Sequence, residues 1–136
     1  MNNKLRDYLM DFKPNKEGAS QHTFEHLQHQ NRFSLPQDYI DFMKAFNGGE
    51  GGIGENGWLY LFPAEALMDI NKAYGILMEQ IPGYFLFGKD AADTGYAFQK
   101  QTGAIYSFGL MSNFETNSMD FCGSNFSEFT EYLFNT

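Results

Sequence analysis

Three histidines and a glutamate within one short stretch are the residues of this sequence best suited to bind a metal ion. His22, Glu25 and His26 form the pattern H-x-x-E-H, and His29 extends it. On a helix these histidines share a face, where they could hold zinc in the manner of one class of peptidases. A third ligand would have to be His29 or a carboxylate, because the chain has no other histidine. The segment is polar, so we expect solvated histidines on an exposed helix, with a metal-binding enzyme as the lesser alternative.

Two further groups of residues could carry catalysis. Asp90 and Asp93 flank the loop KDAADTG, where paired carboxylates could act as general acid and base. Asp in a hairpin loop more often stabilises the turn itself. The loop also lacks the D-x-D-x-D-G order of residues that is typical of a calcium-binding loop. Cys122 is the only cysteine, and no pattern of base and orienting group surrounds it. We therefore predict a protein that is not an enzyme and uses neither a cofactor nor a metal.

The stretch NGGEGGIGENG, residues 47–57, contains two overlapping G-x-G-x-x-G patterns. A dinucleotide-binding loop follows a strand and opens a helix, so that phosphate meets free N–H groups. Here the predicted order is a helix followed by a strand, and Glu50 and Glu55 place negative charge where phosphate would lie. We interpret the stretch as a glycine-rich connection between a helix and a strand, with some mobility, and as a candidate part of a partner-binding rim.

Composition limits the class of protein and its partners. The chain has 136 residues, which suits one domain, and 18% of them are aromatic. The chain has 17 acidic and nine basic residues, which gives a formal charge of −8 at pH 7. This balance disfavours nucleic acid and anionic membranes as partners and is compatible with a basic protein. The sequence shows no signal peptide and no run of about 20 apolar residues, so we expect a cytoplasmic protein.

The spacing of apolar residues and the positions of turn-forming residues predict the helices and strands that must position these side chains. Helices are expected over residues 3–12, 20–30, 36–46 and 63–73, and as a closing helix capped by Ser124. Strands are expected over residues 58–62, 84–87, 95–99 and 104–108, with a possible further strand over 119–121. This α+β pattern indicates a single domain with N-terminal helices, an antiparallel β-meander sheet of about four to six strands, packing helices and a C-terminal helix.

Three stretches, taken in order, resemble one known family. LPQDYIDFMKAFNGGEG resembles the opening signature of the SUKH superfamily, which includes the fungal cell-wall synthesis regulator (Smi/Knr) group. YFLFGKDAADTGYAFQKQTGAIYSF looks like the strands of that family's core, and SNFSEFTEYL is similar to its closing helix. The resemblance implies a Smi/Knr-like domain over residues 20–134, preceded by an N-terminal helix and connection over residues 1–19, as one compact domain.

The resemblance also implies a function. Many bacterial members of the family look like immunity proteins that bind and block polymorphic toxins, often nucleases or deaminases, and they are not enzymes. A regulatory scaffold that binds other proteins is the alternative. An acidic inhibitor would be steered toward the basic cleft of such a toxin. We expect Trp58 to be a core ring or a ring at the edge of the sheet, with a binding hot spot as the alternative. The candidate partner-binding residues are Glu50, Glu55, Trp58, Asp90, Asp93, Glu115 and Asp120.

Overall fold

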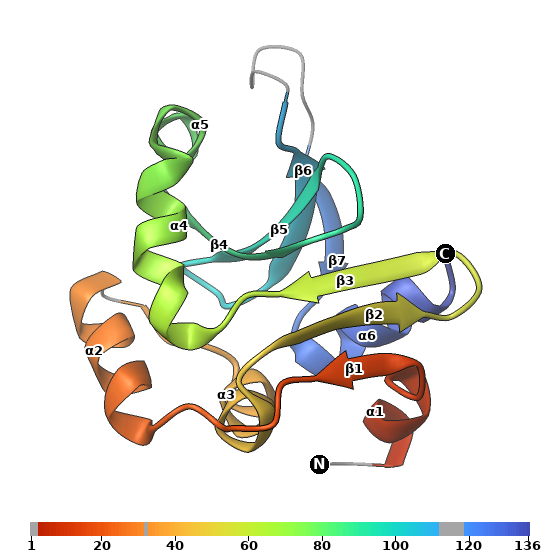
Figure 1. Ribbon diagram of the computed structural model, residues 1–136. Coiled ribbons are helices and arrows are strands. Elements are labelled where there is room, and N and C mark those ends of the chain that lie inside the picture. The colour runs from red at the N-terminus through yellow and green to blue at the C-terminus, as the bar shows by residue number, and fades with distance from the viewer. Residues whose placement is uncertain (1–2, 32, 112–118) are drawn as a thin grey trace.

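A single antiparallel sheet organises the molecule. The structure is a computed structural model, and it describes residues 3–31, 33–111 and 119–136. Within these residues the sheet has seven strands, and each strand pairs with the next one along the chain (Figure 1). This number exceeds the expected four to six, although the α+β meander is confirmed. The strands are β1 (Phe12–Pro14), β2 (Gly49–Ile53), β3 (Gly57–Leu61), β4 (Tyr84–Lys89), β5 (Thr94–Gln99), β6 (Ile105–Gly109) and β7 (Asp120–Gly123).

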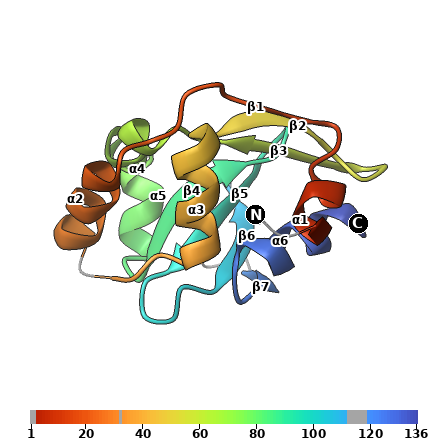
Figure 2. The ribbon, with the colours of Figure 1, turned by 90° about the horizontal axis from the view of Figure 1, so that it is seen from below.

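Helices cover the sheet and close the chain. They are α1 (Asn3–Tyr8), α2 (Gln21–Asn31), α3 (Gln37–Phe46), the 3-10 turn η1 (Ala64–Ala66), α4 (Leu67–Ala73), α5 (Gly75–Gln80) and α6 (Phe126–Phe134). Figure 2 shows α3 and α6 in front of the central strands. None of the helices in the described ranges is both long and apolar enough to cross a bilayer.

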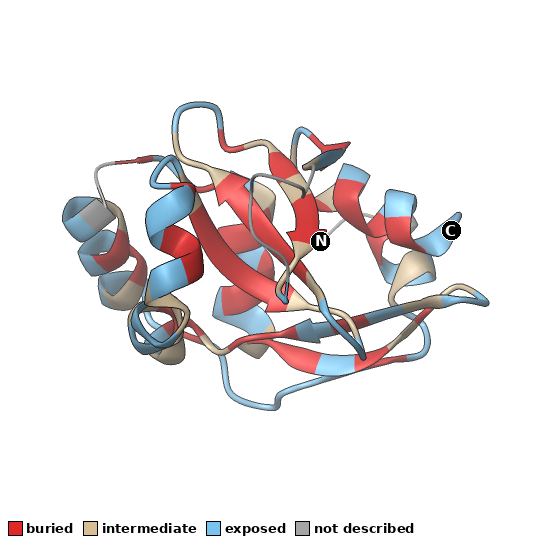
Figure 3. Cartoon of the chain, turned by 90° about the horizontal axis from the view of Figure 1, so that it is seen from above, coloured by how far each residue is buried: buried red, intermediate tan, exposed pale blue. Residues whose placement is uncertain are grey.

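Aromatic rings fill the space between α3, α6 and the sheet. Tyr39 of α3 is fully buried, and its ring meets those of Phe87, Phe98 and Phe126 at centroid distances of 5.6, 4.8 and 5.8 Å. Phe87 and Phe98, on neighbouring strands, stack at 4.1 Å. Figure 3 shows the burial concentrated along the central strands and the inner sides of the helices. Such rings bury much apolar area per residue, which accounts for a core built with so many of them.

Side chains that bond to backbone join the helices to one another and to the sheet. Asp38 of α3 accepts hydrogen bonds from the backbone N–H groups of Phe126 and Ser127, at 3.0 and 2.9 Å, at the first turn of α6. A carboxylate is well placed there, because the first N–H groups of a helix have no partner within it. Asn71 of α4 bonds both the N–H and the C=O of Leu86, each at 2.9 Å, and so continues the ladder where β3 no longer pairs with β4.

The glycine-rich stretch is a strand rather than the expected connection. Gly49 and Gly51 lie against the backbone of β1: a Cβ on either would approach a main-chain oxygen within 3 Å. Gly54 has a φ of 71° in the turn that leads to β3, and a Cβ there would come within 2.3 Å of the carbonyl oxygen of Phe134. The glycines therefore let both ends of the chain pack closely on the β2–β3 hairpin.

Other boundaries differ from those expected for local reasons. The first helix ends at Tyr8 rather than at residue 12, because the chain turns to add Phe12–Pro14 to the sheet as an edge strand, where proline is tolerated. Asn125 caps α6 by accepting from the N–H of Glu128 at 2.8 Å, in place of Ser124. The short helix α5 was not expected, since one turn after Gly75 shows little periodicity.

Candidate protein-binding surface

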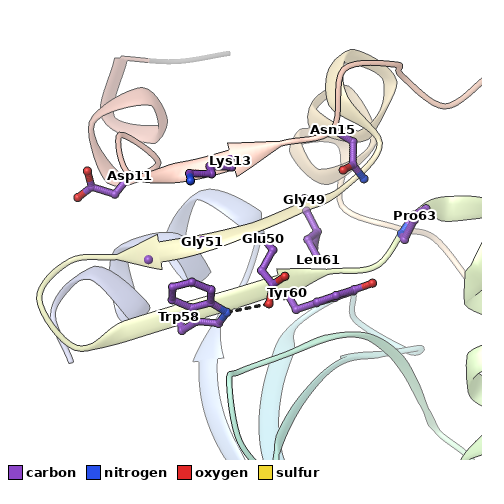
Figure 4. Close-up of a pocket in the computed structure, with 11 residues that line it drawn as sticks. Asp11, Lys13, Asn15, Gly49, Glu50, Gly51, Trp58, Tyr60, Leu61 and Pro63 are labelled. Atoms are coloured by element: carbon purple, nitrogen blue, oxygen red, sulfur yellow. Dashed lines mark hydrogen bonds between the residues drawn. The ribbon is translucent and has the colours of Figure 1, made fainter.

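The outer face of the first three strands carries an open groove, which we call the sheet groove. Its volume is about 730 Å³. Figure 4 shows its side chains rising from β1, β2 and β3. It is lined by Asp11, Lys13, Asn15, Gly49, Glu50, Gly51, Gly52, Trp58, Tyr60, Leu61 and Pro63. Strand alternation builds this face, because Trp58 and Tyr60 point outward while Leu59 and Leu61 are buried.

A tryptophan and a glutamate form the centre of the sheet groove. Trp58 lies opposite Gly52 in the strand register, and Glu50 lies opposite Tyr60. Glycine at position 52 leaves open space, so the indole reaches diagonally toward Glu50. The indole N–H donates to Oε2 of Glu50 at 3.2 Å (Figure 4). Trp58 and Tyr60 remain 38% and 39% exposed, which makes them surface rings rather than core rings.

A second, smaller cleft of about 300 Å³ opens where β3 diverges from β4 and β5. Trp58 lines it on one side, and Asp90 with its loop lines the other. The carboxylate of Asp90 accepts from the N–H groups of Ala92 and Thr94 at 2.8 and 3.0 Å, so it forms the turn of its own loop. Asp93 is exposed in the same loop and does not line the cleft.

The remaining predicted residues are dispersed. Glu55 is exposed in the turn between β2 and β3 and lines a different groove, described below. Asp120 is exposed on β7, at the other end of the sheet order. Glu115 lies outside the described residues. The structure thus brings Glu50, Trp58 and Asp90 around one part of the surface and does not gather the other acids there.

The residues considered for chemistry show no assembled site. His22, Glu25, His26 and His29 are exposed on α2, and no described group of three His, Cys, Asp or Glu side chains is placed to hold a metal ion. Cys122 is buried, and its thiol donates to the carbonyl oxygen of Asp120 at 3.4 Å. Burial raises the pKa of the thiol, and hydrogen bonding with Ser107 offsets part of that effect. A protonated, buried thiol is a poor nucleophile.

Sequence reasoning missed several residues of this surface. Tyr60 was not singled out, although the alternation in WLYL places it beside Trp58. Asp11 and Lys13 enter the sheet groove only because the N-terminal segment adds an edge strand. A three-residue strand ending in proline carries no sequence signal that would have predicted this pairing.

The fold and this surface define an α+β domain built on a seven-stranded antiparallel meander that carries open grooves on its surface. The family described as the SMI1 / KNR4 family (SUKH-1) matches residues 18–132, and the chain belongs to it. Among curated proteins, none matches the sequence. The assignment confirms the predicted superfamily and is consistent with a non-enzymatic immunity or regulatory domain.

Proposed function

We propose that this protein is a bacterial, cytoplasmic immunity protein that binds a cognate toxin domain and neutralises it. The toxin is a basic domain of the nuclease or deaminase type. The observation that carries the proposal is the pair formed by Trp58 and Glu50 at the centre of the sheet groove. Membership of the SMI1 / KNR4 family supports a function in binding another protein.

The chemistry of this pair suits a cationic side chain of the partner. A half-exposed indole offers a π face to an arginine or lysine, and such contacts strengthen when water is excluded. The indole N–H holds Oε2 of Glu50, which fixes the carboxylate beside the ring. A guanidinium lying on Trp58 could therefore also bond to Glu50 in a charge-assisted contact. Tryptophan and tyrosine at the centre of a contact surface commonly carry much of the binding energy.

Growth rescue tests the proposal. The toxin-like domain encoded beside this protein would be co-expressed with it, and any complex would be purified and its stoichiometry measured. We expect restored growth and a one-to-one complex. Trp58→Ala should raise the Kd of that complex at least about 30-fold, as expected for a central aromatic anchor. Glu50→Gln should chiefly speed dissociation, because it removes the charged partner of a hydrogen-bonded contact at the centre of the surface.

Matched substitutions control for non-specific effects. Ile76→Ala removes an exposed apolar side chain on α5, and Glu25→Gln removes an exposed acid on α2. Neither should change rescue or the Kd. Loss of affinity of equal size in Ile76→Ala and Trp58→Ala would contradict the assigned surface. No rescue and no complex would favour the regulatory scaffold, and a pull-down from native cytoplasm would then identify the partner.

A further inference from the structure

A second groove lies where the two ends of the described chain meet the β2–β3 turn, and we call it the terminal groove. Its volume is about 680 Å³. Only Gly54 and Glu55 of its lining belong to the stretch that the family matches, residues 18–132. The rest comes from α1 and the residues that follow it, and from the end of α6 and beyond. Most of the lining of this groove therefore lies outside the stretch that the family matches.

Apolar side chains form one wall of the terminal groove. The rings of Tyr8 and Phe134 pack at a centroid distance of 5.0 Å and an interplanar angle of 47°. Phe134 is still 40% exposed, and Met10 beside it is 77% exposed. Gly54 permits this arrangement, because its missing side chain lets the backbone of Phe134 approach the turn. The wall offers a surface on which an alkyl chain can lie.

Acidic side chains also line the terminal groove. Asp7, Asp11 and Glu55 line the groove, and none of its described lining residues is a lysine, arginine or histidine. Desolvation is the main cause that raises the pKa of Tyr8, followed by Glu131 outside the groove, and Asp7 adds the smallest part. Apolar side chains and acids that line the same groove, with no basic residue among its described lining, match a side chain that combines an alkyl stem with a positive end.

We propose that the terminal groove is a binding site for an arginine or lysine side chain on an exposed segment of the protein partner. The stem would lie along Tyr8, Met10 and Phe134, and the cation would lie among Asp7, Asp11 and Glu55. Asp11 also lines the sheet groove, so the two grooves adjoin at this residue. A partner seated on Trp58 could therefore extend into this site. That the partner is the toxin rests on the proposed function, whereas the chemistry of the site does not.

A peptide titration tests the site without knowledge of the partner. The probe is a capped pentapeptide with one arginine between glycines, added to isotopically labelled protein and followed by amide chemical shifts. We expect saturable shifts centred on Gly54, Glu55 and Asn135. The citrulline peptide, which keeps the stem and lacks the charge, should bind more weakly. Asp7→Asn with Glu55→Gln should weaken arginine binding about fivefold, as expected for two exposed charge pairs.

Controls separate this site from general attraction to an acidic surface. Glu25→Gln with Glu79→Gln removes two exposed acids from α2 and α5 and should leave the binding unchanged. Met10→Gln should weaken the binding of both peptides, because it replaces part of the apolar wall. Equal binding of both peptides by the unmodified protein, or shifts spread evenly over α2 and α5, would overturn the inference.

The two proposals fail in different ways. If the arginine peptide binds the terminal groove but no toxin is neutralised, the site stands and the immunity function fails. If toxin is neutralised and the peptide does not bind, the immunity function stands. In that case the double variant Asp7→Asn with Glu55→Gln should also leave the Kd for the toxin unchanged. That result would overturn the inference about the terminal groove and leave the proposed immunity function in place.

Discussion

At the scale of single residues, the hydroxyl of Tyr39 is the most informative atom. It is buried in the aromatic core, and no described residue forms a hydrogen bond with it. A buried polar group without a partner costs free energy, so Tyr39→Phe should increase the free energy of unfolding by about 1 kcal/mol. Urea unfolding would measure the change. Tyr84→Phe is the control, because its hydroxyl accepts from Gln99 at 3.4 Å and should give no gain.

The same substitution has a signature in alkaline solution. Burial raises the pKa of Tyr39 above its ordinary value of 10.0, so the folded protein keeps a proton that the unfolded chain releases. The contribution of the Tyr39 hydroxyl to the free energy of unfolding is therefore constant below about pH 10 and falls as the pH rises above that value. The Tyr39→Phe variant lacks that loss, so its advantage should widen above pH 10. A lower stability of the variant at neutral pH would mean that the hydroxyl has a favourable partner.

At the scale of elements, the β2–β3 hairpin depends on glycine where both chain ends pack on it. Gly54→Ala places a Cβ in a left-handed backbone conformation and within 2.3 Å of the Phe134 carbonyl oxygen. We expect a loss of more than about 1 kcal/mol in the free energy of unfolding. Gly75→Ala is the control, since a Cβ there meets nothing within 4 Å and alanine favours a helix. Thermal melts would compare the two, and equal effects would contradict the close packing.

The elements also show what the sequence could and could not predict. The helices α3 and α6 were visible because their apolar side chains recur with the helical period. The strands β3 to β6 were visible because they are short runs rich in aromatic and apolar residues, bounded by turn signals. The strand β2 was missed because four of its five residues are glycine or glutamate and carry no apolar period. Its partner β1 was missed because long-range pairing alone defines it.

Part of the candidate binding surface could likewise be predicted from the sequence, and part could not. Trp58 and Glu50 were both selected from sequence, and the structure places them in contact. The interpretation of the Asp90 loop as a turn former is also confirmed. The terminal groove could not be predicted, because it exists only where residues more than a hundred positions apart, such as Tyr8 and Phe134, come together.

At the scale of the whole molecule, the formal charge of −8 bears on how the proposed toxin would approach. We expect the association rate with a basic toxin to fall at least about tenfold as salt is raised from low to high concentration. The physical reason is that the Debye length shrinks from about 30 Å at 0.01 M to about 3 Å at 1 M. Stopped-flow mixing across that range would measure it, with dissociation rates nearly constant. A salt-independent association rate would contradict electrostatic steering.

The strictly sequential strand order has a consequence for how the protein folds. Each strand pairs with its neighbour in the chain, and the β2–β3, β4–β5 and β5–β6 hairpins each close only a short loop. The β1–β2 and β3–β4 pairs are joined through helices, over residues 15–48 and 62–83, and so close longer loops. The packing of α1 on α6 is different, since it joins the two ends of the described chain. Contacts of that kind form late and open first. The terminal groove should therefore be assembled last, and local fraying of the ends would abolish it while the sheet stays folded.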